Sequence, residues 1–98
     1  MKFWCKVHRA KGEIILAICD ENLLERKLKF GEVELIISKE FYGEKKIEEK
    51  EAVKMMKEAT IINLFGEEIV KLAIKYGFIS KENVMLIEGV PHAQAIKF

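Results

Sequence analysis

Residues 90–94, of sequence Val-Pro-His-Ala-Gln, are the part of this chain best suited to chemistry or recognition. They include the only proline, the only glutamine and one of the two histidines among the 98 residues. Pro91 fixes its own φ and biases the preceding residue toward an extended conformation, so His92 and Gln94 should point in a reproducible direction. In an extended segment these two side chains share one face. Their donors and acceptors suit a base edge, an amide or a backbone group.

His92 is the natural candidate for acid–base chemistry, because an unperturbed imidazole titrates near physiological pH. Catalysis would also require a nucleophile near this base and a group that orients the base. Cys5 and Cys19 are the available thiols, and the sequence has no Gly-X-Ser-X-Gly, P-loop or dinucleotide-binding motif. We therefore predict no catalytic residue. The alternatives are a small enzyme or metabolite-binding domain that uses His92, and a structural role in which His92 or Gln94 satisfies backbone groups of a nearby loop.

The spacing of the cysteines and histidines argues against a zinc site and against a disulfide bond. Cys5 and His8 are three residues apart on a predicted strand, so they point to opposite faces. In the predicted N-terminal hairpin Cys5 pairs near Ala17, which keeps it away from Cys19. We expect both thiols to be small core residues, with no metal and no cofactor.

Positive charge is concentrated locally, although the net charge is only +1. Residues 1–30 have an excess of basic side chains, and residues 31–58 have an excess of acidic ones. The strongly basic surface of an autonomous nucleic-acid binder is therefore absent. A local contact with phosphate would use Lys6, Arg9 and Lys11 near the first predicted turn; the alternative is the solvated surface of a charge-rich protein.

Length and composition predict one soluble, cytoplasmic domain over residues 1–98. Half of the residues are hydrophobic, which is enough for a core, and no stretch approaches the ~20 apolar residues of a membrane span. The first residues lack a signal-peptide pattern. Two cysteines are too few for a disulfide framework, so we expect reduced thiols and no disulfide-linked partner. The Lys/Glu-rich composition is typical of thermophiles.

Two strand-like runs at the N-terminus predict a β-hairpin. Residues 2–9 alternate in polarity, and residues 13–19 are apolar on both faces, with a glycine in the short connection between them. The second strand should be central and covered on both sides. A further alternative function, a protein–protein interaction module, would use an uncovered face of this hairpin. That face would comprise Trp4, Ile14, Leu16 and Ile18.

The rest of the chain alternates between strand-like and helical patterns. Asp20 is expected to cap the short turn that follows it, and Asn63 to brace the start of the second helix. The expected elements are strands over 33–38, 45–47, 84–88 and 93–98, helices over 48–59 and 67–76, turns at 41–43 and 89–91, and a short extended connection over 60–65. This order predicts an α+β fold: a small, mostly antiparallel sheet with an N-terminal hairpin, two central helices and C-terminal strands.

Five short segments of the chain carry a resemblance to a known family. They are Cys19-Asp20-Glu21, Phe41-Tyr42-Gly43, Glu51-Ala52-Val53, Asn63-Leu64-Phe65-Gly66-Glu67 and Gly89-Val90-Pro91-His92-Ala93-Gln94. Together they span nearly the whole chain and resemble a family of small archaeal proteins, the domain of unknown function 424 family. Because that family is grouped with RNA-binding and translation-related proteins, the resemblance implies an archaeal cytosolic protein that associates with RNA or the ribosome. It supplies no catalytic residues.

These observations together predict a non-enzymatic RNA-associated protein bound to the archaeal ribosome or translation machinery. We expect Lys6, Arg9 and Lys11 to contact the phosphate backbone, and His92 and Gln94 to make a specific contact. Phosphate neutralisation supplies most of non-specific RNA affinity, so the near-neutral charge argues against tight autonomous binding. Docking onto a ribonucleoprotein surface avoids part of this objection.

Overall fold

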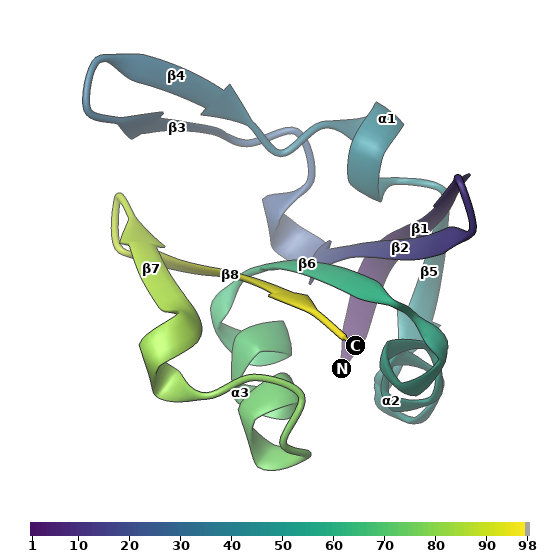
Figure 1. Ribbon diagram of the computed structural model, residues 1–98. Helices are drawn as coiled ribbons and strands as arrows, with labels where there is room; N and C mark the ends of the chain where they lie inside the picture. Colours follow the sequence, from purple (N-terminus) through teal and green to yellow (C-terminus); the bar gives the residue numbers. More distant parts are fainter. Residues whose placement is uncertain (98) are drawn as a thin grey trace.

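A six-stranded sheet with helices on both faces organises the chain, which is described over residues 1–97 in a computed structural model (Figure 1). The strands are β1 Lys2–Ala10, β2 Glu13–Asp20, β3 Lys27–Phe30, β4 Val33–Ile36, β5 Lys45–Glu48, β6 Ile61–Phe65, β7 Val84–Ile87 and β8 Val90–Ile96. The helices are α1 Lys39–Tyr42, α2 Glu49–Glu58 and α3 Glu67–Lys75. The main sheet has the order β5-β1-β2-β6-β8-β7, and β3 and β4 form a separate pair. Within residues 1–97 only β2 and β6 pair in parallel, so the predicted α+β class with a mostly antiparallel sheet is confirmed.

The N-terminal hairpin turns on two residues, Lys11 and Gly12, which both have positive φ. This two-residue turn pairs Cys5 with Ile18, one residue away from the predicted partner Ala17. A one-residue shift reverses which side chains share a face. The predicted interaction surface is therefore wrong, because Trp4 opposes Cys19 and lies on the other face from Ile18.

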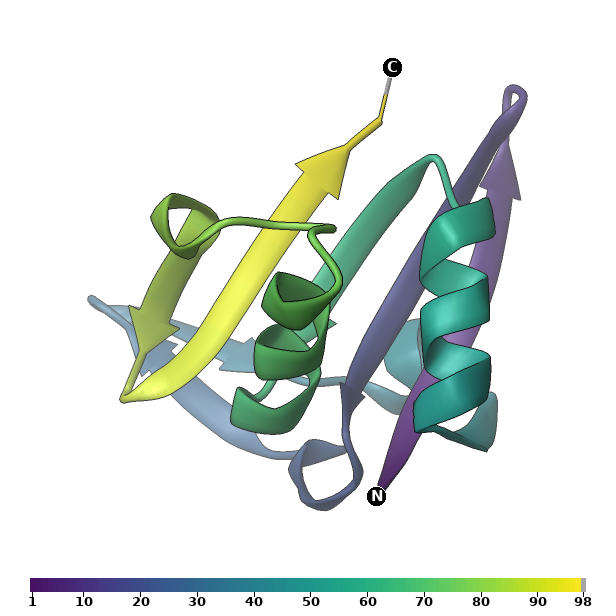
Figure 2. The ribbon, with the colours of Figure 1, turned by 90° about the horizontal axis from the view of Figure 1, so that it is seen from below.

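Helices α2 and α3 cover one face of the sheet (Figure 2). The apolar side of each helix packs on alternate side chains of the strands, and this packing forms the larger core. The largest fully enclosed side chains are Phe3, Cys5, Leu16, Ile18, Met56, Ile62, Leu64 and Ile69. The second strand is central and buried on both faces, as predicted from its apolar composition.

A second, smaller core lies on the opposite face, where residues 21–43 fold over the sheet. The predicted strand over 33–38 ends at Ile36 and pairs with β3, a strand that the sequence analysis did not predict. Leu28 and Leu35 point into this core, whereas Val33 is 59% exposed near the hairpin turn. The predicted turn at 41–43 is instead the end of α1, whose first turn is capped by Ser38 Oγ accepting from Phe41 N at 3.2 Å.

The segment predicted as a connection, residues 60–65, contains the central strand β6. It is hydrogen-bonded to β2 on one side and to β8 on the other. Ile62 and Leu64 are fully buried against the helices. A five-residue apolar run cannot be distinguished from a connection by periodicity alone, and its two strand partners decide its role.

The last hairpin turns on Glu88 and Gly89, which have φ of 47° and 79°. Strand β8 therefore begins at Val90, and Pro91 lies within the strand rather than in the predicted turn. Pro91 opposes Leu86 next to the closing pair, a position where backbone groups point away from β7. Its missing N–H therefore costs no β7 hydrogen bond. The predicted strand over 93–98 is confirmed up to Ile96, and Phe98 lies outside the described residues.

Asp20 caps a helix that is remote in sequence, not the turn that follows it. Its carboxylate accepts hydrogen bonds from the backbone N–H groups of Glu68 and Ile69, both at 2.9 Å. These are the unpaired donors of the first turn of α3, which begins after Gly66 as predicted. The strand β2 is thereby fixed to the helix that covers its neighbour β6.

Two further findings bear on the class of protein. Within residues 1–97 no helix is long and apolar enough to span a membrane. Cys5 and Cys19 are both buried free thiols.

Candidate functional site

The second face of the sheet displays its side chains in three rows across the strands, and the register defines each row. The first row is Trp4, Cys19, Phe65, His92 and Met85; the second is Lys6, Ala17, Asn63 and Gln94; the third is His8, Ile15, Ile61 and Ile96. Lys6 and Gln94 are thus in one row, separated by three strand spacings, about 14 Å. His92 and Gln94 share this face, while Ala93 and Ala95 pack toward the helices, as predicted.

Helix α1 covers the β1 end of this face and engages its two polar side chains. Lys6 Nζ donates to the carbonyl of Glu40 at 2.9 Å. His8 Nε2 donates to the carbonyl of Phe41 at 2.9 Å, and the His8 and Phe41 rings stack with centroids 4.8 Å apart. Since a carbonyl only accepts, Nε2 carries the proton. Lys6 and His8 therefore help to hold α1 on the sheet.

Asn63 is bound at the centre of the face, not at the start of α3 as predicted. The hydroxyl of the buried Tyr42 donates to Asn63 Oδ1. Burial raises the pKa of the Tyr42 hydroxyl, so it remains a protonated donor. Asn63 thereby connects α1 to β6, and its row neighbour Gln94 is exposed.

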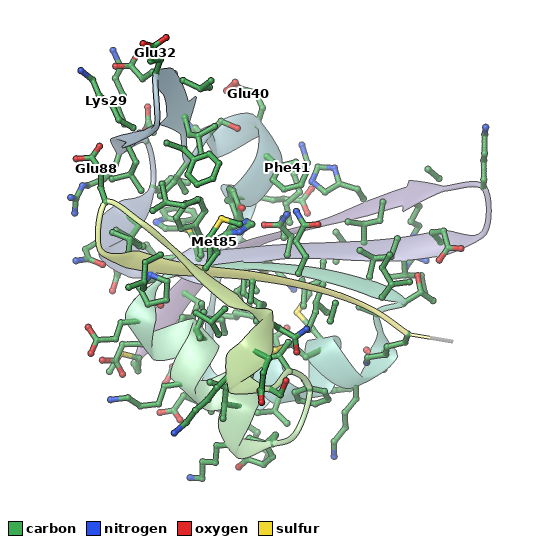
Figure 3. The ribbon with its side chains drawn as sticks, turned by 60° about the vertical axis from the view of Figure 1, so that its left-hand side comes forward. Lys29, Glu32, Glu40, Phe41, Met85 and Glu88 are labelled. Carbon is green, nitrogen blue, oxygen red and sulfur yellow. The ribbon has the colours of Figure 1, made fainter. Side chains whose placement is uncertain are left out.

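The β6 and β8 part of this face is the least covered. We refer to Ile15, Ile61, Asn63, Met85, His92, Gln94 and Ile96 as the open face. Ile96 is 62% exposed and Met85 is 48% exposed. Figure 3 shows Met85 on the sheet, with Phe41 of α1 and the β3–β4 turn that carries Glu32 drawn above it. The β3–β4 hairpin is held at the β7–β8 turn, at the edge of this region, by Glu88, whose carboxylate accepts from the backbone N–H of Lys29.

His92 is half-buried, and its ring lies against Phe65 with centroids 4.7 Å apart. Burial lowers the pKa of His92 below its ordinary value, which favours the neutral ring. A neutral imidazole offers one donor and one acceptor. His92 therefore suits recognition of a polar group without adding positive charge.

The burial of His92 predicts a pH dependence of stability. Because its folded pKa is depressed, the unfolded chain binds the proton more readily, so stability is lost as the pH falls from about 6.5 through the folded pKa. We expect the urea midpoint to decrease from pH 7 to pH 5 and this decrease to be smaller in His92→Asn. The matched variant His8→Asn should retain it, since His92 is still present. An equal pH dependence in wild type and His92→Asn would contradict the assignment to His92.

The other predicted phosphate contacts lie away from the open face. Arg9 is on the helix side of β1 and lines a cavity with Met55 and Glu58. Lys11 is at the exposed tip of the first hairpin. The structure therefore places Lys6, His92 and Gln94 on one face, and places Arg9 and Lys11 at its margin or beyond.

The thiols are poorly suited to nucleophilic chemistry. Cys19 lies in the row of His92 but is fully buried beside Phe65, and burial raises its pKa to about 12. Cys5 faces the helices, and burial raises its pKa to about 11. The thiolate is the nucleophilic form, so both thiols are inert near neutral pH. In the described part of the chain, no group of three or more His, Cys, Asp or Glu side chains could hold a metal ion.

The apolar members of the open face and the β3–β4 hairpin were not predicted from the sequence. A signal for the hairpin is present in the sequence. Residues 27–30 and 33–36 contain alternating leucines, lysines and glutamates on either side of Gly31-Glu32, a pattern typical of a two-residue β-hairpin. The exposure of Ile96 and the partial exposure of Ile61 have no such signal, because exposure depends on what packs above a side chain.

Comparisons with known proteins agree with this fold. Residues 8–98 match a family described as "Protein of unknown function (DUF424)". A solved structure described as the "Crystal structure of an uncharacterized conserved protein from Methanopyrus kandleri" is similar, with a TM-score of 0.85 and 27% sequence identity over 100% of this chain and 95% of that chain. No curated protein matches the chain. The family match includes the whole open face, and the chain belongs to the DUF424 family.

Proposed function

We propose that the protein is a non-enzymatic RNA-associated protein that binds a single-stranded segment of ribosomal or other ribonucleoprotein RNA on the open face. The observation that carries this proposal is the adjacent pair Asn63 and Gln94, with His92 in the next row. Three isoleucines in the third row provide apolar contact beside these polar groups. Single-stranded RNA is recognised when bases lie on such a surface and their edges form hydrogen bonds with side chains.

Each polar group would have a distinct part in binding. The exposed amide of Gln94 offers a donor and an acceptor, which suits the edge of a base. The neutral ring of His92 offers the same pair in a half-buried position. The stacked rings of His8 and Phe41 border the face and offer an apolar surface against which a base could lie.

Phosphate contacts would come from the margin of the face and would be few. Lys11 lies at the tip of the first hairpin, and Arg9, two residues earlier near the end of β1, points to the helix side of the sheet. Lys6 already donates to Glu40, so we assign it a long-range electrostatic contribution and not a direct contact. With a net charge of +1, the protein should bind RNA weakly alone and mainly where a ribonucleoprotein provides further contacts.

Ultraviolet crosslinking and co-sedimentation with archaeal ribosomal subunits test this proposal. We expect the wild-type protein to crosslink to RNA, and Gln94→Ala with His92→Ala to lower the crosslinked fraction about tenfold, because a good side-chain contact to a base edge is worth about 1–3 kcal/mol. Asn22→Ala removes an exposed amide from the turn Glu21–Leu23 and serves as the matched control. An unchanged crosslinked fraction in the double variant, or no RNA crosslink in any ribosomal fraction, would overturn the proposal.

A further inference from the structure

Helices α2 and α3 lie on the side of the sheet opposite the open face (Figure 2). Residues of both helices line a groove on that side. Its volume is about 540 Å³, and it is lined by Glu49, Lys50, Val53, Lys54, Lys57, Leu72 and Tyr76. Val53 and Leu72 form an apolar floor where the two helices meet. Tyr76, just after the last turn of α3, is 51% exposed at the rim. The groove thus combines an apolar floor, an aromatic side chain at its rim and the lysines of α2 along one side.

The charged side chains of α2 are segregated around the helix. Lys50, Lys54 and Lys57 recur at spacings of four and three residues, so they form one ridge along the groove. The acidic side chains Glu51 and Glu58 lie on other sides of the helix, where Glu51 pairs with Lys45 at 3.2 Å and Glu58 borders the cavity of Arg9. Like charges at these spacings disfavour the helix slightly, by about 0.2–0.5 kcal/mol per pair.

Within residues 1–97, no ion pair neutralises Lys50, Lys54 or Lys57. Over residues 1–97 the ion pairs are Lys45–Glu51 and Lys46–Glu21, and neither involves the groove. Glu49 is the single carboxylate among the groove-lining residues, against three lysines. The groove therefore presents uncompensated positive charge to solvent beside an apolar floor.

We propose that this groove binds an acidic amphipathic helical segment of a partner protein. Lys50 and Lys57 are separated by about 10.5 Å along the axis of α2, which matches about two turns of a facing helix. An apolar residue of that segment would occupy the floor between Val53 and Leu72, and its Asp or Glu side chains would meet the three lysines. This is the recognition of an amphipathic helix in a groove, with anchor residues repeating at helical spacing.

The apolar floor favours a protein segment over RNA as the occupant. A polynucleotide would place phosphate and ribose over Val53 and Leu72, where they would lose water without gaining hydrogen bonds. Tyr76 is the one aromatic side chain among the groove-lining residues, which offers a single position for a stacked base. Aromatic side chains such as Tyr are enriched in protein interfaces relative to the rest of the surface.

Fluorescence anisotropy with the full chain tests the proposal. The probe is a synthetic amphipathic helix of about 15 residues with leucines on one face, flanked by glutamates, carrying fluorescein. Matched probes replace the glutamates with lysines, or are a labelled oligouridine RNA. We expect the glutamate probe to bind, and Lys50→Glu with Lys54→Glu and Lys57→Glu to raise its Kd at least about tenfold, because charge reversal puts like charges opposite one another.

The control variant carries Lys27→Glu, Lys29→Glu and Lys39→Glu, which make the same change in net charge on the other side of the sheet. It should leave the Kd within about twofold of wild type, as expected for charges beyond a Debye length. Tyr76→Ala should weaken binding with no change in charge. Three results would overturn the proposal: no binding of the glutamate probe, an equal loss in the control variant, or oligouridine binding more tightly than the peptide and depending on the same three lysines.

Discussion

Gly66→Ala is expected to lower the free energy of unfolding by about 4 kcal/mol or more. Gly66 has φ 125° and ψ 153°, a region that is essentially restricted to glycine and costs other residues about 1–3 kcal/mol. A Cβ at this position would lie 2.4 Å from Cγ of Asp20. The carboxylate would have to move, and its two hydrogen bonds to the start of α3 would be lost.

Gly77→Ala is the matched control for this effect. Gly77 also has positive φ, 77°, but a Cβ there would meet no atom within 4 Å. Its cost should be limited to the left-handed conformation, about 1–2 kcal/mol. Urea denaturation followed by circular dichroism measures the loss of unfolding free energy in both variants. Equal losses in the two variants would show that backbone conformation alone explains Gly66, and would contradict the contact with Asp20.

Asp20→Ala is expected to cost about 3 kcal/mol, since it leaves two backbone donors at the start of α3 without partners. Hydrogen bonds to an ionised group contribute about 1.5–3 kcal/mol each. Burial raises the pKa of Asp20, whereas the hydrogen bonds from Glu68 and Ile69 lower it. Because the pKa of Asp20 is raised overall, desolvation offsets part of the stabilisation that these hydrogen bonds provide. We therefore expect the loss of unfolding free energy to lie near the lower end of the range.

Glu21→Ala provides the comparison, because it removes the neighbouring carboxylate. Glu21 is exposed and pairs with Lys46 at 2.8 Å on the surface, so its loss should leave the urea midpoint nearly unchanged. Asp20→Asn should be intermediate between Asp20→Ala and wild type, since one amide oxygen can still accept while the amide nitrogen opposes a second donor. A midpoint for Asp20→Ala equal to that of Glu21→Ala would contradict the capping role.

The contact between Asp20 and α3 also bears on the open face. Gly66 N donates to the carbonyl of Pro91 at 2.8 Å, directly before His92. The same short loop therefore receives the carboxylate of β2, starts α3 and holds the beginning of β8. Variants at Asp20 or Gly66 that remain folded should therefore disturb the start of α3 and, through the Gly66–Pro91 hydrogen bond, the position of His92.

The two proposed surfaces lie on opposite sides of the sheet, so they do not compete for space. If both proposals hold, RNA would bind at the open face while an acidic protein segment binds between α2 and α3. Such an arrangement suits a position where RNA and protein adjoin. The two experiments are separable, because Gln94 and His92 are on β8 and the three lysines are on α2.

Local patterns predicted much of the architecture. The apolar run over 13–19 on both faces indicated a central covered strand, and the period of the residues after Glu48 and after Gly66 indicated the two helices that are observed. Alternation also placed His92 and Gln94 on one face before any tertiary contact was known. These properties depend on residues close in sequence, and chain periodicity is therefore sufficient to predict them.

Long-range contacts decided the rest. The sequence places Asp20 before a short turn, but only the approach of β2 to β6 brings its carboxylate to α3, 48 and 49 residues away. Asn63 likewise becomes part of the sheet face because β6 pairs with β2 and β8, and Tyr42 of α1 then binds it there. The sequence by itself determined helices α2 and α3, most strands and the shared direction of His92 and Gln94. The tertiary structure alone decided which face is open and which lysines line a groove, because exposure depends on what packs above a side chain and not on its neighbours in the chain.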